Sequence, residues 1–176
     1  MIYLGIGSNL NSTFGNRFKN IELAINFLKK NKIKILKKSS FYETQSYPNK
    51  KDPKFINVVI SIDTNLSPIN LMKLLISIEQ KLERVRHKKN DPRTCDLDII
   101  DYKKKIINFK MGDDNLNIPH KRMNLRNFVL YPLREISPSW THPISKKNIS
   151  FLIDNLTTPN NEITKLSLND IIGYVK

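Results

Sequence analysis

The first hundred residues alternate between the hydrophobic periods of strands and helices, and this order restricts the possible folds more than any other feature. An apolar run over 2–7 predicts a short buried strand, and apolar residues at helical spacing over 14–30 predict an amphipathic helix. Extended segments follow between 33 and 44. Residues 56–63 then alternate with a period of two, which predicts a further strand.

The second predicted helix is the clearest element of the sequence. Ser67 is a good N-cap and Pro68 suits the first helical position. An apolar stripe then runs from Leu71 to Val85, and a strand is predicted over 96–102. The resulting order is βαββαβ, the ferredoxin-like α+β arrangement, in which both helices cover one face of an antiparallel sheet. The opposite face must be covered by something else or must serve as a site.

The patterns are weaker beyond residue 103. They suggest a short strand at Ile106 and Ile107. They also suggest a short helix over 124–136, which Pro132 interrupts, and another over 148–155. The tail from 157 to 176 shows no firm pattern. We therefore predict one domain over 1–176, with a ferredoxin-like core and a C-terminal extension.

Composition excludes several classes of protein. The chain has 176 residues, of which 39% are hydrophobic, and this fits one globular domain. Its apolar runs fall short of the roughly 20 residues that a membrane span needs, and its start lacks the positively charged region of a secretory signal. The single Cys95 excludes an internal disulfide framework. We expect a cytoplasmic monomer without a membrane partner.

The formal charge of +14 would suit an anionic partner, but 23 of the 30 basic residues are Lys. Lys, Asn and Ile all have AT-rich codons, so we interpret the excess as a genomic bias placed on solvated surfaces. No nucleic-acid partner is expected on this ground, because charge bears on solubility and steering. Arginine is the better guide, since three of the seven fall within ten residues: Arg84, Arg86 and Arg93.

The strongest local feature is Asp96-Leu97-Asp98. Residues two apart on a strand share a face, so Leu97 faces the helices and both carboxylates face the open side. Paired carboxylates suit Mg²⁺, which keeps waters and phosphate oxygens in its other positions. The three clustered arginines flank this strand, and metal plus arginine is what phosphoryl transfer requires. A solvated polar face and purely structural ion pairs are the alternatives.

Three other features bear on a site. The segment Gly5-Ile6-Gly7-Ser8-Asn9-Leu10 leads from the first strand toward the first helix, but Leu10 stands where a dinucleotide-binding motif needs its third glycine, so a tight turn is the simpler interpretation. Phe55 and Asn57 share the open sheet face and would suit a flat heterocycle, although the C-terminal segment could instead cover the aromatic ring. His120 lies among cations, which makes contact with a phosphate plausible.

Several segments match, in order and spacing over about residues 1–155, the pattern of one family. The most specific is Pro92-Arg93-Thr94-Cys95-Asp96-Leu97-Asp98-Ile99. The others are Gly7-Ser8-Asn9-Leu10, Ser40-Phe41-Tyr42-Glu43-Thr44, Phe55-Ile56-Asn57, Arg84-Val85-Arg86, Ile118-Pro119-His120 and Arg126-Asn127-Phe128. Together they resemble the hydroxymethyldihydropterin pyrophosphokinases of folate biosynthesis.

The resemblance implies a single pyrophosphokinase domain that transfers the β,γ-pyrophosphoryl unit of ATP to a hydroxymethyldihydropterin and releases AMP. ATP and the dihydropterin are then the partners. Asp96 and Asp98 match ligands of two Mg²⁺ ions, and Arg84 and Arg93 match arginines that assist the transfer. The positions that match ATP contacts are Glu79, Arg86, Ile99, His120, Lys121 and Arg126. Those that match pterin contacts are Thr44, Gln45, Tyr47, Phe55, Asn57 and Phe128.

Two alternatives come from other classes of protein. An RRM-like RNA-binding module shares the ferredoxin-like fold, but the aromatic-rich strand motif is missing, and Asp96 and Asp98 would repel RNA phosphates without metal. A small regulatory ligand-binding domain would not need arginines beside the carboxylates.

Overall fold

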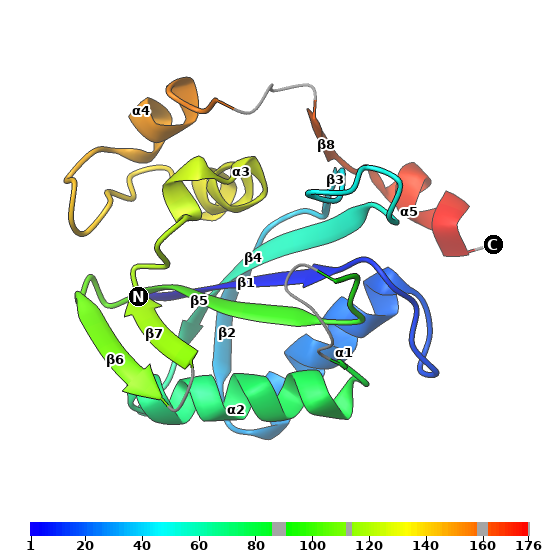
Figure 1. Cartoon of the computed structure of the whole chain (residues 1–176), viewed down its shortest axis with the longest axis horizontal. Helices are drawn as coiled ribbons and strands as arrows, with labels where there is room; N and C mark the ends of the chain where they lie inside the picture. The colour runs from blue at the N-terminus through cyan, green and yellow to red at the C-terminus, as the bar shows by residue number, and fades with distance from the viewer. Residues whose placement is uncertain (86–90, 112–113, 158–161, 176) are drawn as a thin grey trace.

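The computed structural model describes residues 1–85, 91–111, 114–157 and 162–175, and it contains one antiparallel six-stranded sheet between two layers of helices (Figure 1). The strand order is β5-β1-β4-β3-β8, and β2 also pairs with β4. These strands are β1 (Ile2–Ser8), β2 (Lys34–Lys38), β3 (Tyr42–Thr44), β4 (Phe55–Asp63), β5 (Asp96–Tyr102) and β8 (Ile163–Lys165). The predicted α+β arrangement is confirmed.

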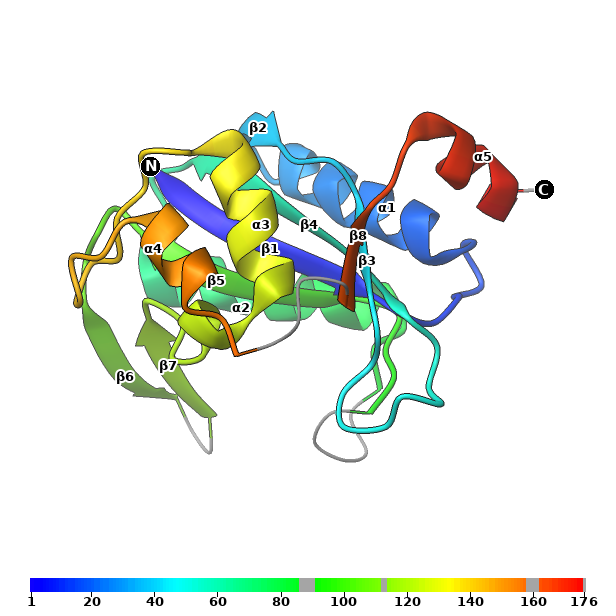
Figure 2. The ribbon, with the colours of Figure 1, turned by 90° about the horizontal axis from the view of Figure 1, so that it is seen from above.

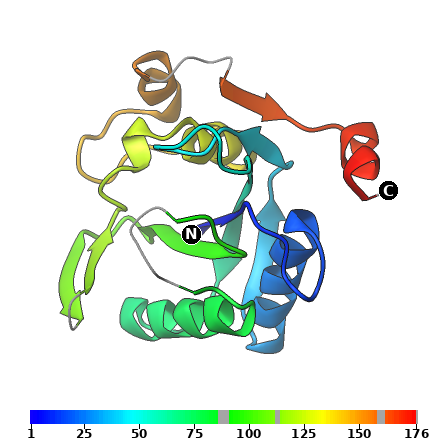
Figure 3. The same ribbon diagram turned by 45° about the vertical axis from the view of Figure 1, so that its right-hand side comes forward.

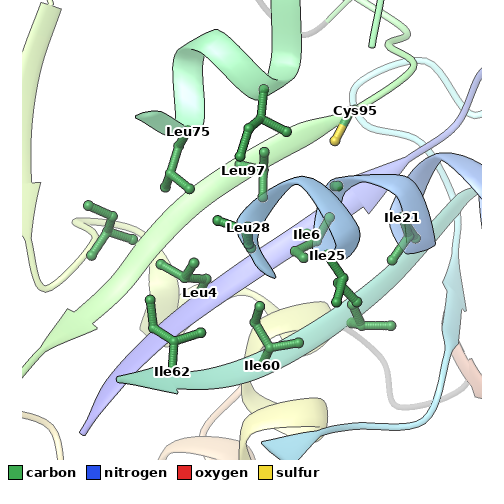
Figure 4. Packing of buried hydrophobic residues seen from close by; sticks show 14 of the residues in the cluster. Leu4, Ile6, Ile21, Ile25, Leu28, Ile60, Ile62, Leu75, Cys95 and Leu97 are labelled. Carbon is green, nitrogen blue, oxygen red and sulfur yellow. The ribbon is translucent and has the colours of Figure 1, made fainter. Parts of the chain in front are cut away.

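Helices α1 (Arg17–Lys30) and α2 (Pro68–Lys81) cover one face of the sheet. Side-chain caps fix where they begin, because Asn16 accepts a hydrogen bond from the backbone N–H of Lys19, and Ser67 accepts one from Asn70. The start of α1 is therefore three residues later than predicted. Between the helices and the strands lies the main apolar core, where each buried Leu or Ile contributes about 1.5–3 kcal/mol (Figure 4).

The extended run predicted between 33 and 44 is divided into β2 and β3. Both pair with β4, at Lys38↔Ile60 and Tyr42↔Asn57. Ser39 bridges the gap, because its hydroxyl accepts a hydrogen bond from the Val59 N–H while its own N–H donates to the Val59 carbonyl. The break between β2 and β3 therefore removes few hydrogen bonds to β4.

The opposite face of the sheet is covered in part by α3 (Asn127–Ile136) and α4 (Ile149–Asp154) (Figure 3). Tyr3, Val59 and Ile100 pack there against a second apolar cluster that includes Leu130 and Leu133. Within the described residues, this layer occupies part of the surface that an RRM-like module would offer to RNA.

The predicted interruption at Pro132 is wrong, because α3 continues through this residue. Proline removes one helical hydrogen bond. Pro132 is nevertheless buried beside Leu130 and Leu133, and packing of the apolar face supplies most of the stability of a helix inside a protein. The burial of this face thus outweighs the missing bond.

The remaining elements lie at the periphery. Strands β6 (Ile107–Met111) and β7 (Asp114–Ile118) form a separate two-stranded sheet, and the turn η1 (Met123–Leu125) precedes α3. The tail, for which no element was predicted, adds β8 to the edge of the sheet and ends in α5 (Leu168–Val175). Within the described residues, no helix has both the length and the apolar character needed to cross a membrane.

Candidate active site

A cavity of about 480 Å³ lies on the sheet face opposite α1 and α2. Strands β1, β4 and β5 provide its floor, the start of α3 with η1 provides one wall, and the loop after β3 provides another. Eleven of the predicted site residues line it: Thr44, Gln45, Tyr47, Phe55, Asn57, Arg93, Asp96, Asp98, His120, Arg126 and Phe128.

Asp96 lies between two guanidinium groups at the first position of β5. Its Oδ1 is 2.6 Å from Arg84 Nη1, and its Oδ2 is 2.6 Å from Arg93 Nη2. Burial opposes ionisation of this carboxyl, but Arg93 and Arg84 outweigh burial and lower its pKa. Asp96 is therefore a carboxylate at neutral pH.

Asp98 is the more open of the two carboxylates, with 38% of its side chain exposed. Its Oδ2 lies 3.4 Å from Arg126 Nη1 and 3.9 Å from His120 Nε2. Its Oδ1 has no partner among the described residues, so this oxygen is available to a cation. Asp96 and Asp98 were predicted to share the open face of their strand, and both side chains line the cavity.

His120 is held in its neutral form. Burial lowers the pKa of its imidazole, and Arg126 and Arg122 lower it further against the attraction of Asp98. A neutral imidazole can donate or accept a hydrogen bond without adding charge to the site.

Helix α2 orients Arg84 through the carboxylate of Glu79. Glu79 is 3% exposed, pairs with the Arg84 guanidinium, and accepts a hydrogen bond of 2.7 Å from the Leu97 N–H. Burial opposes the charge of Arg84, but Asp96 and Glu79 outweigh it and raise its pKa further. Glu79 thus lies behind Arg84 and not on the cavity surface, where a nucleotide contact was expected.

Two more residues predicted to contact ATP, Ile99 and Lys121, do not line the cavity, and neither does Arg84. The side chain of Ile99 is buried in the core between the helices and the sheet, so it does not reach the cavity. Lys121 is exposed to solvent and does not line the cavity. Arg86 lies outside the described residues. Their roles remain predictions.

The cavity wall away from the carboxylates carries aromatic and amide side chains. Asn57 Nδ2 donates a hydrogen bond of 3.0 Å to Thr44 Oγ1. Gly7 faces Asn57 across the strands, and a Cβ there would lie 3.0 Å from Asn57 Oδ1, so glycine leaves room for the amide. The guanidinium of Arg93 lies 5.0 Å from the centroid of the Phe55 ring.

Several lining residues were not among the predicted site residues. They include Ser46, Lys50, Arg122, Met123, Leu125, Thr157 and Glu162. Arg122 could have been inferred from the basic stretch around His120. Glu162 and Thr157 carry no signal in the sequence, because they reach the cavity through the position of the tail.

Asn9 joins three segments around the cavity, although it was not among the predicted site residues. Its side chain is buried, at 2% exposure. The amide Nδ2 donates to the Pro53 carbonyl over 3.1 Å, and Oδ1 accepts from the Arg93 N–H over 2.7 Å. The end of β1, the segment before β5 and the loop that ends at Pro53 are therefore held together by one side chain.

We expect Asn9→Ala to lower the free energy of unfolding by about 1–3 kcal/mol, because the Arg93 N–H loses its acceptor, while the Pro53 carbonyl keeps only the Ser46 hydroxyl as a donor. Urea unfolding monitored by circular dichroism measures this change. The matched control is Asn11→Ala, since Asn11 is exposed two residues away and should change stability by less than about 0.5 kcal/mol. Equal losses in the two variants would contradict the structural role of Asn9.

Comparison with known proteins gives one consistent family. The model of the family "7,8-dihydro-6-hydroxymethylpterin-pyrophosphokinase (HPPK)" matches residues 3–138. The folic acid synthesis protein fol1 of Schizosaccharomyces pombe is 37% identical over 155 residues, which cover 88% of this chain and 20% of that protein. The 2-amino-4-hydroxy-6-hydroxymethyldihydropteridine pyrophosphokinase of Aquifex aeolicus is 33% identical over 159 residues, covering 90% of this chain and 94% of that protein.

The chain thus spans about a fifth of the length of the fungal relative and most of the length of the bacterial one. Among solved structures, wild-type HPPK-DHPS of Plasmodium falciparum is similar with a TM-score of 0.69 and 15% sequence identity. The match covers 87% of this chain and 44% of that chain. This likeness concerns the fold.

Proposed function

Because the chain belongs to the 7,8-dihydro-6-hydroxymethylpterin-pyrophosphokinase family, we propose that it transfers a pyrophosphoryl unit from ATP to 6-hydroxymethyl-7,8-dihydropterin in folate synthesis. The products are AMP and the pterin diphosphate. One observation carries the proposal: paired carboxylates, arginines, and the Phe55–Asn57 wall line the same cavity.

The reaction forms a bond between the hydroxymethyl oxygen and the β-phosphorus of ATP, and it breaks the bond between that phosphorus and the oxygen bridging to the α-phosphate. The hydroxyl loses its proton, and negative charge grows on the departing AMP. Arg93 and Arg84 provide fixed positive charge at Asp96, beside the place where the triphosphate would lie. Such charge stabilises a transition state that spreads negative charge over phosphate oxygens.

We further propose that Asp96 and Asp98 hold two Mg²⁺ ions together with ATP. No group of three or more His, Cys, Asp and Glu side chains within the described residues could hold a metal ion alone. Two carboxylates nevertheless fit Mg²⁺, which is commonly bound by one or two carboxylates plus waters and substrate phosphates. When bound, the ions would neutralise phosphate charge and orient the reacting groups.

The pterin would occupy the wall formed by Phe55 and Phe128. Both rings line the cavity, and Asn57 and Thr44 offer polar atoms at its edge. A bicyclic heterocycle stacked on an aromatic ring gains about 1–3 kcal/mol, by analogy with stacked nucleic-acid bases. The amide edge would then reject analogues that leave its polar atoms unpaired.

We expect Phe55→Ala to weaken binding of the dihydropterin by about one to two powers of ten, because a stacking surface is lost. Binding of ATP without the pterin should change little. Calorimetry with each ligand separately measures both affinities. Phe109→Ala is the matched control, since this ring is exposed on β6, outside the cavity. Loss of ATP affinity with pterin binding retained would place the pterin elsewhere.

The activity itself is tested by ³¹P NMR of a mixture of the chain, ATP, Mg²⁺ and 6-hydroxymethyl-7,8-dihydropterin. We expect the signals of AMP and of a pterin diphosphate to grow together. Release of ADP and inorganic phosphate would contradict transfer of a pyrophosphoryl unit. A gel shift with RNA that needs no Mg²⁺, in a chain that releases no AMP, would favour an RNA-binding module.

A further inference from the structure

The C-terminal segment 162–175, outside the family match at 3–138, lies beside the cavity wall. We propose that it positions the pterin-facing wall: β8 supports β3, and Glu162 holds Lys50 in the loop after β3. This inference rests on the proposed function, because it names the part of the chain that shapes the pocket for the pterin substrate.

The first observation is the pairing of β8 with β3 (Figure 2). Three register pairs join the strands, Tyr42↔Lys165, Glu43↔Thr164 and Thr44↔Ile163. The Leu166 N–H also donates to the Phe41 carbonyl over 2.9 Å. Without β8, the three-residue β3 would be an edge strand with one row of unpaired N–H and C=O groups.

The supported strand leads directly into the pocket. Thr44 is the last residue of β3, and its hydroxyl receives the hydrogen bond from Asn57. Gln45 and Tyr47 follow and line the cavity. A displacement of β3 would therefore move the amide contact and this side of the pocket together.

The second observation is that the segment is anchored beyond β8. Leu166 belongs to the main core, and the ring of Tyr174 lies 5.5 Å from that of Phe18 on α1. The Tyr174 hydroxyl donates a hydrogen bond of 2.9 Å to Glu43 Oε1. Because Glu43 is itself a β3 residue, α5 and β8 hold the same strand.

The third observation is an ion pair at the rim of the cavity. Lys50 Nζ lies 3.0 Å from Glu162 Oε1, and both residues line the cavity. The two side chains are 70% and 31% exposed, and such a pair adds little to global stability. Its effect would instead be local, on the position of the loop that carries Lys50.

The test uses the full chain with Lys50→Glu, Glu162→Lys and the double exchange. Each single variant is expected to raise the Kd for the dihydropterin about two- to fivefold, and the double variant to restore it. The dihydropterin is uncharged at neutral pH, so a general change of field would not mimic this result. The unfolding midpoint should stay unchanged. Lys51→Glu is the control, because the Lys51 ammonium has no ion pair within the described residues.

A second variant tests the strand. Thr164→Pro removes a backbone donor from β8 and is expected to raise the Kd for the dihydropterin about tenfold in a folded chain. If that variant fails to fold, the charge exchange decides. Unchanged pterin affinity in the single charge variants, or no recovery in the double variant, would overturn the inference.

The same measurements separate this inference from the proposed function. A wild-type chain that binds the dihydropterin but releases no AMP would refute the activity, while the charge exchange would still report on the wall. A wild-type chain that releases AMP, with all variants binding like wild type, would leave the activity intact and refute the role of the segment.

Discussion

Replacing Asp98 by Ala is expected to lower the turnover of AMP release by at least about 10²–10³-fold, the loss typical of one missing electrostatic group at a transition state. Asp98 lines the cavity, and its Oδ2 lies 3.4 Å from Arg126 Nη1. Removing the carboxylate takes away an Mg²⁺ ligand and leaves Arg126 without its counter-charge. Initial rates over a range of Mg²⁺ concentrations measure the loss.

Two further variants make this result specific. Asp98→Asn keeps the volume of the side chain but removes its charge, so it should lose nearly as much turnover as Asp98→Ala. Asp154→Ala should behave like the wild type, because Asp154 is exposed at the end of α4. Near-normal turnover in Asp98→Ala would mean that the proposed metal ligand is wrong.

Arg93→Ala is expected to lower kcat by about 10²–10³-fold with little change in ATP affinity. The guanidinium lies 2.6 Å from Asp96 Oδ2 and 5.0 Å from the Phe55 centroid, between the carboxylate and the pterin-facing wall. That position suits a charge that stabilises the transferring group more than bound ATP. Single-turnover kinetics and calorimetry measure rate and affinity separately.

Arg93→Lys keeps the charge but loses the planar fork, so it should recover only part of the rate. Arg134→Ala is the control, because Arg134 is exposed on α3 beside Tyr131. Equal losses of ATP affinity and rate in Arg93→Ala would make Arg93 an ordinary binding residue.

The faces of the central strands could be predicted because their side chains alternate with a period of two. Leu97 belongs to the core beneath the helices, whereas Asp96 and Asp98 line the cavity, as predicted. The same rule placed Phe55 and Asn57 on the cavity side. Alternation is a local property, so it can be read without knowing the partner strand.

The tail could not be predicted, because β8 has only three residues and shows no period of its own. Its position depends on pairing with β3, more than 100 residues earlier in the chain. Asn9 was missed for a related reason, since an asparagine in a turn is common. Its partners, Arg93 and Pro53, become neighbours only in the folded chain.

The sheet face opposite α1 and α2 serves two purposes, and the start of α3 separates them. On β4, Val59 packs beneath the helix, whereas Asn57, two residues earlier, lines the cavity. On β5, Ile100 packs in the same cluster and also borders the cavity beside Asp98. One additional turn at this end of α3 would advance it by about 5.4 Å. Residues 126–128 at this end of the helix line the cavity, so a longer helix would take up part of the space that they now border. The position at which α3 begins therefore sets how much of this sheet face remains open to a ligand.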